Sequence, residues 1–237
     1  MDDITSFLDD DSKIRNGKKA GKYNKLSFFD RFKRSLESDI DIDPGRLMGL
    51  TDGIFGMVMT LLVFGIGLPE FLISDYSDFI SYIFSLRPTI GLTIVSFVLI
   101  SSFWIYHHEF KKNKKLNIPY LWINILFLIS ISFIPFTTSL IGKYHYFFLS
   151  EVLFGLNIFL TIVFFLLMYY YAYQRDFLKN MPSHDERHYI YHTFYILMGF
   201  TVMVNLLDFN VSGNFVYLFL LMPVISTIRD IRYKMKL

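Results

Sequence analysis

The chain has 237 residues, of which 53% are hydrophobic and 19% aromatic, and its formal net charge is only +2. This apolar content exceeds what a soluble domain of this size usually carries, and it indicates an integral membrane protein. The low net charge argues against nucleic-acid binding, and the absence of cysteine excludes disulfides, thiolate catalysis and cysteine-based metal sites.

The first 45 residues are polar and mixed in charge, and we expect them to form a cytoplasmic N-terminal tail. Within this tail, residues 26–36 place four apolar residues on one helical face, opposite three basic residues. This pattern predicts an amphipathic helix, which would lie either on an anionic lipid surface or on the protein's own cytoplasmic face. Pro44-Gly45 then breaks the chain before the first apolar run.

Arg46–Leu68 is that first apolar run, and it predicts the first transmembrane helix. It has no charged residue from Gly53 to Leu68. The run is long enough to cross a hydrocarbon core of about 30 Å at about 1.5 Å per residue. Ionisable groups are costly about one turn inside an apolar segment, so Asp52 indicates either a functional site or a constraint on the fold.

Five further apolar runs predict membrane crossings. They lie at Thr89–Tyr106, Pro119–Ile141, Phe147–Tyr173, Tyr189–Leu207 and Phe215–Ile228. The segment Tyr76–Leu86 is too short to cross alone, so we expect it to lie in the outer interface or to re-enter partway. The predicted fold is therefore all-α, with six transmembrane helices in a domain over residues 46–230 and a short cytoplasmic tail at residues 231–237.

Lysine and arginine are distributed unequally between the two ends of these spans. With the N-terminus inside, the inner segments hold 21 of the 23 basic residues, and the outer segments hold only Arg87 and Lys143. Because basic residues are enriched on the cytoplasmic side, this distribution predicts a multi-pass protein of the cell membrane with both termini in the cytoplasm.

One face of the first span collects small residues. On a helical wheel Gly49, Gly53, Gly56, Thr60, Val63 and Gly67 fall in one sector, with Met57 and Phe64 beside it and Leu61 a little further round. Small residues at this spacing let another backbone approach closely. The face would pack either against another helix of the same chain, which the wheel alone favours, or against copies of itself around an axis.

In the second arrangement, Met57, Thr60, Leu61 and Phe64 would line a narrow path. Rings of apolar side chains gate such a path by dewetting, and a ring of hydroxyl groups replaces part of an ion's hydration shell.

Polar residues from three spans are predicted to converge at one depth. Arg46 and Asp52 are six residues apart, so they do not lie above one another on the helix and need partners elsewhere. The candidates are Thr51 beside Asp52, Trp104, His107 and His108 at the inner end of the second span, and Asn124 about one turn into the third. We expect a network near the cytoplasmic face that satisfies these otherwise costly groups.

His107-His108-Glu109 also raises the alternative of a metal site. Such a site needs at least three convergent ligands, and His145 lies at the opposite side of the predicted bundle. We therefore expect structural or hydrogen-bonding histidines, with no metal and no cofactor.

Several motifs resemble those of one known family. Arg46-x-x-x-Leu50-Thr51-Asp52 is similar to the R-x-x-x-F-S-D signature of the transmembrane protein 175 family of potassium channels, with Leu and Thr in place of Phe and Ser. Later stretches that resemble the family are Ser96-Phe97, Phe103-Trp104-x-x-His107-His108-x-Phe110, the L-W-x-N-x-L run around Asn124, and Phe133-x-Pro135-Phe136-Thr137. The motifs cover residues 46–140, and the remaining residues are similar only in the number of spans.

The resemblance implies a homotetramer of six-span subunits, in which the first helix of each subunit lines a potassium-selective pore. It implies selectivity without the T-V-G-Y-G carbonyl filter, a motif that the sequence lacks. The family's pore-lining positions fall on Met57, Thr60, Leu61 and Phe64. The signature residues Arg46 and Asp52, with a histidine of the His107-His108 pair, would hold the first helix in place. The implied partners are permeant K⁺ ions and the lipid bilayer.

Two other functions remain open from the sequence. A proton-linked secondary transporter could use Asp52 and His107, although transporters often contain two related halves and no internal repeat is visible here. A membrane scaffold that transports nothing is the second. No Ser-His-Asp order, phosphate loop or nucleotide fingerprint appears, so the sequence predicts no enzyme.

Overall fold

The computed structural model describes residues 43–69, 72–110, 116–178, 181–210 and 215–235. These residues belong to one compact unit, Asp39–Leu237. The amphipathic helix predicted at residues 26–36 lies outside the described residues.

The described part of the chain is almost entirely helical. The elements in order are α3 (Pro44–Phe64), α4 (Tyr76–Ser85), α5 (Arg87–Phe110), α6 (Ile118–Tyr144), α7 (Phe148–Gln174), α8 (His184–Asn210), the 3-10 helix η1 (Phe215–Leu220) and α9 (Leu221–Lys234). Five stretches are long and apolar enough to cross a membrane: α3, the continuous run Tyr76–His108, α6, α7 and α8. The predicted all-α membrane fold is confirmed, whereas the last of the six predicted crossings, Phe215–Ile228, forms η1 followed by α9 and is not among these five stretches.

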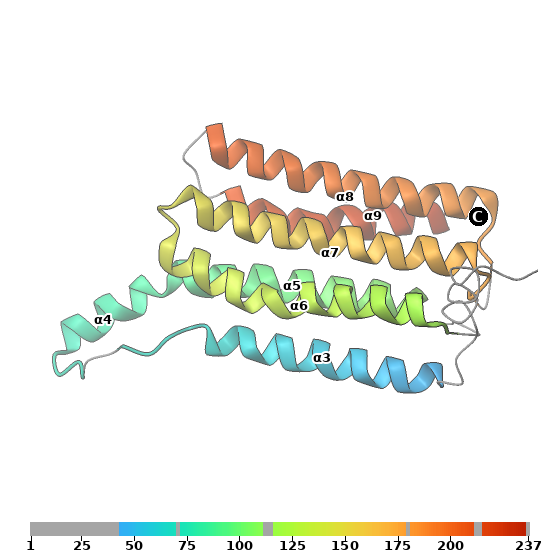
Figure 1. Cartoon of the computed structure of the whole chain (residues 1–237). Coiled ribbons are helices and arrows are strands. Elements are labelled where there is room, and N and C mark those ends of the chain that lie inside the picture. The colour runs from blue at the N-terminus through green and yellow to red at the C-terminus, as the bar shows by residue number, and fades with distance from the viewer. Residues whose placement is uncertain (1–42, 70–71, 111–115, 179–180, 211–214, 236–237) are drawn as a thin grey trace, which may run out of the picture. The chain divides into compact units, whose positions relative to one another are not determined.

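The long helices lie side by side, with α6 at the centre of the contacts (Figure 1). On one side α6 packs against α3 and α5, and on another it packs against α7, which in turn packs against α8. The short helix η1 lies against both α5 and α8. The side chain of Asn117 starts α6 by accepting a hydrogen bond from the backbone N–H of Tyr120 at 3.1 Å.

The first helix is shorter than the sequence predicted. It ends at Phe64 and not at Leu68, because the Gly65 and Ile66 N–H groups bond to the carbonyls of Leu62 and Val63 and close a tight turn. Gly65 also passes so close to α6 that a Cβ there would overlap the Ser139 hydroxyl. Gly67 consequently lies beyond the helix and not on its small-residue face.

Tyr76–Leu86 does form a separate short helix, α4, which projects away from the other helices (Figure 1). None of its residues is buried. The Asp75 carboxylate caps it by accepting from the Ser77 N–H at 3.2 Å, and the Tyr82 hydroxyl donates to the Gly67 carbonyl at 2.6 Å. The hydrogen bond from Tyr82 to Gly67 joins α4 to the segment that follows α3.

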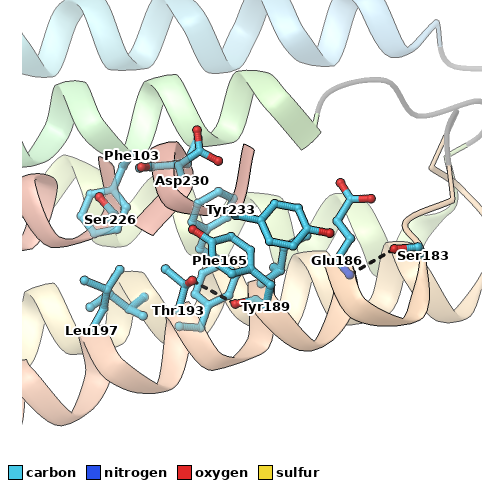
Figure 2. Close-up of a pocket in the computed structure, with 14 residues that line it drawn as sticks. Phe103, Phe165, Ser183, Glu186, Tyr189, Thr193, Leu197, Ser226, Asp230 and Tyr233 are labelled. Atoms are coloured by element: carbon cyan, nitrogen blue, oxygen red, sulfur yellow. Dashed lines mark hydrogen bonds between the residues drawn. The ribbon is translucent and has the colours of Figure 1, made fainter. Parts of the chain in front are cut away.

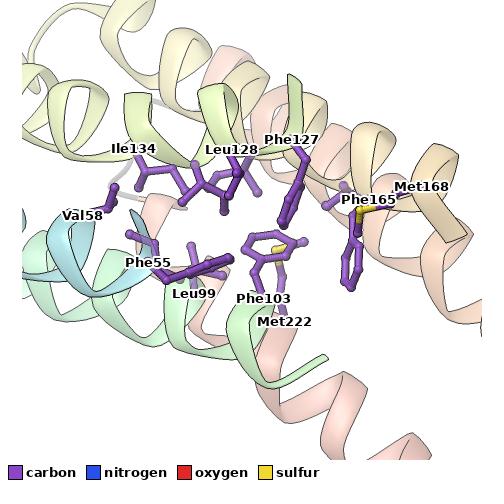
Figure 3. Packing of buried hydrophobic residues seen from close by; sticks show 14 of the residues in the cluster. Phe55, Val58, Leu99, Phe103, Phe127, Leu128, Ile134, Phe165, Met168 and Met222 are labelled. Atoms are coloured by element: carbon purple, nitrogen blue, oxygen red, sulfur yellow. The ribbon is translucent and has the colours of Figure 1, made fainter. Parts of the chain in front are cut away.

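Large apolar side chains from α3, α5, α6, α7, α8, η1 and α9 fill the interior of the bundle, and Figure 3 shows part of this cluster. Phe55 of α3, Phe103 of α5, Phe127 of α6, Phe165 of α7 and Met222 of α9 all belong to this core. In an apolar interior the serine and threonine hydroxyls need acceptors, and many donate to a carbonyl one turn earlier in their own helix, as Thr93 does to Thr89 at 2.9 Å.

Candidate functional site: the first helix and its contacts

One side of α3 is buried within the chain and the other is exposed. The buried side carries Thr51, Phe55, Val58 and Leu62, whose spacing of three and four residues forms a stripe. This stripe faces α5 and α6, against which α3 packs. Among the described residues, the opposite side of α3 is therefore free of contacts with other helices.

The four predicted pore-lining residues lie on that free side. Met57 is 64% exposed, Leu61 45% and Phe64 82%, and Thr60 is also exposed. The Thr60 hydroxyl donates to the Met57 carbonyl at 2.7 Å, so its lone pairs stay available to another donor or to a cation.

The helix glycines lie on the free side too. A Cβ placed on Gly49, Gly53 or Gly56 would meet no atom of another part of the chain within 4 Å. The first of the two interpretations of the small-residue face, packing against another helix of the same chain, is therefore wrong for the described residues. Gly155 of α7 shows the contrast, because a Cβ there would overlap the Asn205 side chain of α8.

Two signature residues join α3 to its neighbours. The Trp104 indole N–H of α5 donates to Asp52 Oδ1 at 2.9 Å. The Asn124 amide of α6 lies 3.5 Å from Thr51 Oγ1, and both residues are almost completely buried. Successive residues of the signature thus contact two different helices, which sets both the depth and the rotation of α3.

The other three residues of the predicted network, His108, Arg46 and His107, differ in how far they are exposed. His108 is exposed and its ring centroid lies 6.1 Å from that of Trp104. Arg46 is exposed at the first turn of α3. His107, in contrast, is 5% exposed and packs into the core.

His107 lies in an aromatic cluster that the sequence analysis did not identify. Its ring stacks on Phe127 at 5.6 Å between centroids with an interplanar angle of 6°, and it lies 6.2 Å from Phe55 and 6.1 Å from Phe165. The spacing of Ser96, Ile100, Phe103 and His107 by four, three and four residues would have placed His107 on the buried face of α5.

Among the described residues, no group of three or more histidine and acidic residues could hold a metal ion. The two neighbouring histidines also differ in environment, since His107 is buried among rings and His108 is exposed. The arrangement around α3 therefore offers helix contacts and an unpartnered apolar face, and no convergent set of ligands.

Comparison with known proteins gives a match over this same region. Residues 46–135 match the family model described as the endosomal/lysosomal potassium channel TMEM175. A potassium channel of Chamaesiphon minutus is 30% identical over 110 residues, which are 46% of this chain and 54% of the relative. A potassium channel of a Chryseobacterium species is 30% identical over 103 residues, which are 43% of this chain and 50% of the relative. The matched regions thus span about half the length of these curated relatives.

The fold resembles a solved structure over a larger part of the chain. The crystal structure of a lysosomal potassium-selective channel TMEM175 homolog from Chamaesiphon minutus superposes with a TM-score of 0.65 at 22% identity. The superposition covers 80% of this chain and 97% of the other. The chain therefore shares its fold with this structure, and its residues 46–135 are similar in sequence to the TMEM175 family.

Proposed function

We propose that this protein is a potassium-selective cation channel in which four subunits gather around one axis, with α3 of each subunit lining the pore. The observation that carries the proposal is the free side of α3, which is apolar, exposed and flanked by glycines. Potassium as the permeant ion is supported by the relatives, which are named potassium channels. A channel binds no resident cofactor, and its function is transport and not catalysis.

The burial pattern of the helices supports a contact beyond the single chain. In the most apolar window of α3 only 22% of the residues are buried, against 50% in α6 and in α7, and the window of α8 is also little buried, at 17%. Lipid alone could cover an apolar side chain, but it gives no reason for three glycines spaced three and four residues apart, Gly49, Gly53 and Gly56, that contact no other described part of the chain. Small residues on a membrane helix are typical of a surface that receives another helix.

The side chains on the free side suggest how cations would be selected. Met57, Leu61 and Phe64 would form apolar rings that exclude water when they are close together. The Thr60 hydroxyl, whose proton is donated to the Met57 carbonyl, would present its oxygen to the path. Selection would then depend on partial dehydration at these rings, without a T-V-G-Y-G filter, which is absent from the sequence.

We place both termini in the cytoplasm of a cell-membrane protein. Along the sequence, 21 of the 23 lysines and arginines fall in the segments that the predicted crossings assign to the same side as the start of α3. The positive-inside rule assigns that end to the cytoplasm. We refer to it below as the proposed cytoplasmic end.

Reconstitution in liposomes tests the proposal directly. We expect potassium flux and unitary current steps from the purified protein. Met57→Ala, Leu61→Ala and Phe64→Ala should each change the unitary conductance or the ratio of potassium to sodium permeability. These are the side chains proposed to form the narrow part of the path.

The chain offers a control for the leucine variant and one for the methionine variant. Leu167 of α7 is 44% exposed, close to the 45% of Leu61, and Met203 of α8 is 44% exposed. Leu167→Ala and Met203→Ala should leave conductance and selectivity unchanged. If the control variants alter permeation as much as the α3 variants do, α3 is not the pore helix. Saturable uptake coupled to a proton gradient, without unitary steps, would instead support the secondary transporter, and an intact fold without flux would support the scaffold.

A further inference from the structure

A side-chain amide from α7 bridges two backbone groups in the middle of α6. With the Asn157 amide oriented so that both of its groups find partners, its Nδ2 donates to the Ser130 carbonyl at 3.0 Å. Its Oδ1 accepts from the Ile134 N–H at 3.2 Å. In an uninterrupted α-helix these two backbone groups bond to each other, because they are four residues apart. All three residues are almost completely buried, so the bridge lies inside the bundle.

The backbone of α6 is interrupted again one residue later. Pro135 lies inside the helix and has no N–H, so the Ile131 carbonyl receives no hydrogen bond from the residue four positions on. The Thr137 and Thr138 hydroxyls both donate to the Ile134 carbonyl, at 3.1 and 2.7 Å. Proline is tolerated in membrane helices where hydroxyls and neighbouring helices bond to the backbone in this way. A side chain inserted between backbone partners and a proline are both causes of helix bending.

The packing of α7 changes along its length. Close to Asn157, a Cβ on Gly155 would overlap the Asn205 side chain of α8. Further toward the proposed cytoplasmic end, Ile162 and Phe165 line a cavity of about 330 Å³ between α5, α7, α8 and α9 (Figure 2). Asn157 therefore lies on the closely packed part of α7, which holds its amide in place, whereas the cavity leaves room for movement further along.

Helix α6 contacts α3 on both sides of residues 130–135. Toward the proposed cytoplasmic end, the Asn124 amide lies 3.5 Å from Thr51 Oγ1. On the other side, the Ser139 hydroxyl lies so close to Gly65, at the end of α3, that a Cβ on this glycine would overlap it. A change in the bend of α6 between these two contacts would move one end of α3 relative to the other.

We propose that residues 130–135 of α6 form a hinge and that Asn157 is the positioning residue that holds it. The amide bridge fixes the bend of α6, and the contacts of Asn124 and Ser139 transmit this bend to the two ends of α3. The hinge thereby controls how close the outer end of α3, with Phe64, comes to the path. This control of the path rests on the proposed channel function. The hinge itself does not, because its bend is measured without ion flux.

Electron paramagnetic resonance measures the bend as a distance between two spin labels. The sequence has no cysteine, so labels attach only where cysteines are introduced. Trp122→Cys and Tyr144→Cys place one label on each side of the hinge, at positions that are 62% and 50% exposed. Dilution with unlabelled protein isolates the distance within one chain. We expect Asn157→Leu to shift the distribution of this distance.

Asn205 of α8 provides the matched control. Its amide donates within its own helix, to the Thr201 carbonyl at 2.8 Å. Leucine keeps the branched shape of asparagine without its polar atoms, and Asn205→Leu should leave the distance distribution unchanged. Asn157→Leu should fold, because the Ser130 carbonyl and the Ile134 N–H can then bond to each other and neither is left unpaired. Circular dichroism shows whether each variant keeps its helical content.

Single-channel recording tests the effect on the path. We expect Asn157→Leu to change the open probability by about fivefold or more, the factor that corresponds to the loss of one net hydrogen bond. The unitary conductance should stay the same, because Asn157 belongs to α7 and not to the helix proposed to line the path.

Pro135→Ala separates a hinge from a general loss of stability. Alanine supplies the missing N–H to the Ile131 carbonyl and removes the hinge. In the Pro135→Ala background, Asn157→Leu should therefore change the open probability by less than about twofold. Pro135→Ala alone should shift the label distance, and it still tests the hinge if Asn157→Leu fails to fold.

Two results would overturn the proposal. The first is a wild-type distance distribution in Asn157→Leu, or in Pro135→Ala if only that variant folds. The second is an effect of Asn157→Leu on the open probability that is equally large with and without Pro135, because the amide would then act without a hinge. If the purified protein carries no current, the channel function fails, and the distance measurement alone decides on the hinge.

Discussion

The Trp104 indole N–H donates a hydrogen bond to Asp52 Oδ1 at 2.9 Å, and this contact joins the first turns of α3 to the end of α5. The two residues are 52 positions apart in the chain. The carboxylate keeps a hydrogen-bond donor at the edge of an apolar segment, where an ionised group without one would be costly. The contact therefore fixes the rotation of α3 and determines which of its sides stays free.

Trp104→Phe removes the indole donor and keeps an aromatic ring in its place. We expect a loss of about 1–2 kcal/mol in stability, since the hydrogen bond joins a neutral donor to a carboxylate at a partly exposed position. Thermal unfolding of the detergent-solubilised protein measures this loss. Trp122→Phe is the matched control, because Trp122 is the only other tryptophan and is 62% exposed. A control variant that is destabilised as much as Trp104→Phe would show that ring size, and not the hydrogen bond, matters.

Thr51 and Asn124 depend on their shared hydrogen bond to different degrees. We therefore expect mutation of the two residues to reduce stability by different amounts. The Thr51 hydroxyl already donates to the Leu47 carbonyl at 2.9 Å, so Asn124→Leu leaves that group satisfied. Thr51→Val instead removes the acceptor of the buried Asn124 amide. We expect Thr51→Val to cost about 1–3 kcal/mol and Asn124→Leu less.

Urea or thermal unfolding of these two variants and of the double variant tests this asymmetry. In the double variant the cost should be smaller than the two single costs added together. Thr93→Val serves as control, because the Thr93 hydroxyl donates to its own helix only at Thr89. Equal costs for Thr51→Val and Thr93→Val would mean that the contact between α3 and α6 contributes nothing.

The sequence predicted the helices well because each apolar run is long and bounded by charged residues or by proline and glycine. Its failures have local causes. A hydropathy profile does not show that Gly65 lies close against the Ser139 hydroxyl. The predicted first helix therefore ends at Leu68, whereas α3 ends at Phe64. It also does not distinguish a 3-10 turn from an α-helical one, and so η1 was missed.

The side-chain contacts of α3 could be predicted from the sequence less well than the helices. The residues around Asp52 could be named, because polar groups inside an apolar run stand out. Their pairing depends on how α5 and α6 are rotated, which one sequence does not give. Trp104 and His107 are only three residues apart, yet Trp104 contacts Asp52 and His107 stacks on Phe127.

The start of α4 should depend on pH through one carboxylate. The Ser77 hydroxyl and nearby backbone N–H groups donate to Asp75 and lower its pKa below the ordinary value. A carboxylate with a lowered pKa in the folded state stabilises above its unfolded pKa, about 3.9, and this stabilisation is lost as the pH falls through the folded pKa. The cap of α4 should therefore hold from neutral pH to about pH 4 and weaken below it.

Hydrogen exchange of the amides in the first turn of α4, corrected for the intrinsic effect of pH, measures this weakening. Asp75→Asn keeps a capping side chain that does not titrate, so its exchange should not rise on acidification. Asp75→Ala should exchange faster at every pH. Identical pH profiles for the wild type and Asp75→Asn would exclude Asp75 as the titrating group.

The glycines on the free side of α3 give the sharpest test of assembly, because they separate folding from association. A Cβ at Gly53 or Gly56 meets nothing within 4 Å among the described residues, so Gly53→Leu and Gly56→Leu should leave the subunit folded. Leucine also favours a helix over glycine by about 0.8 kcal/mol. If copies of α3 meet through this side, the same change blocks the close approach and should shift the protein from tetramer to monomer.

Gly199 of α8 provides the matched control for that shift. A Cβ at Gly199 likewise meets nothing within 4 Å, and the residue also lies inside a long apolar helix. Native mass spectrometry should show a tetramer for Gly199→Leu and smaller species for Gly53→Leu and Gly56→Leu, with equal helical content in all three. A tetramer that survives both α3 variants would mean that the small-residue side of α3 faces lipid, and the pore would then have to be formed by another helix.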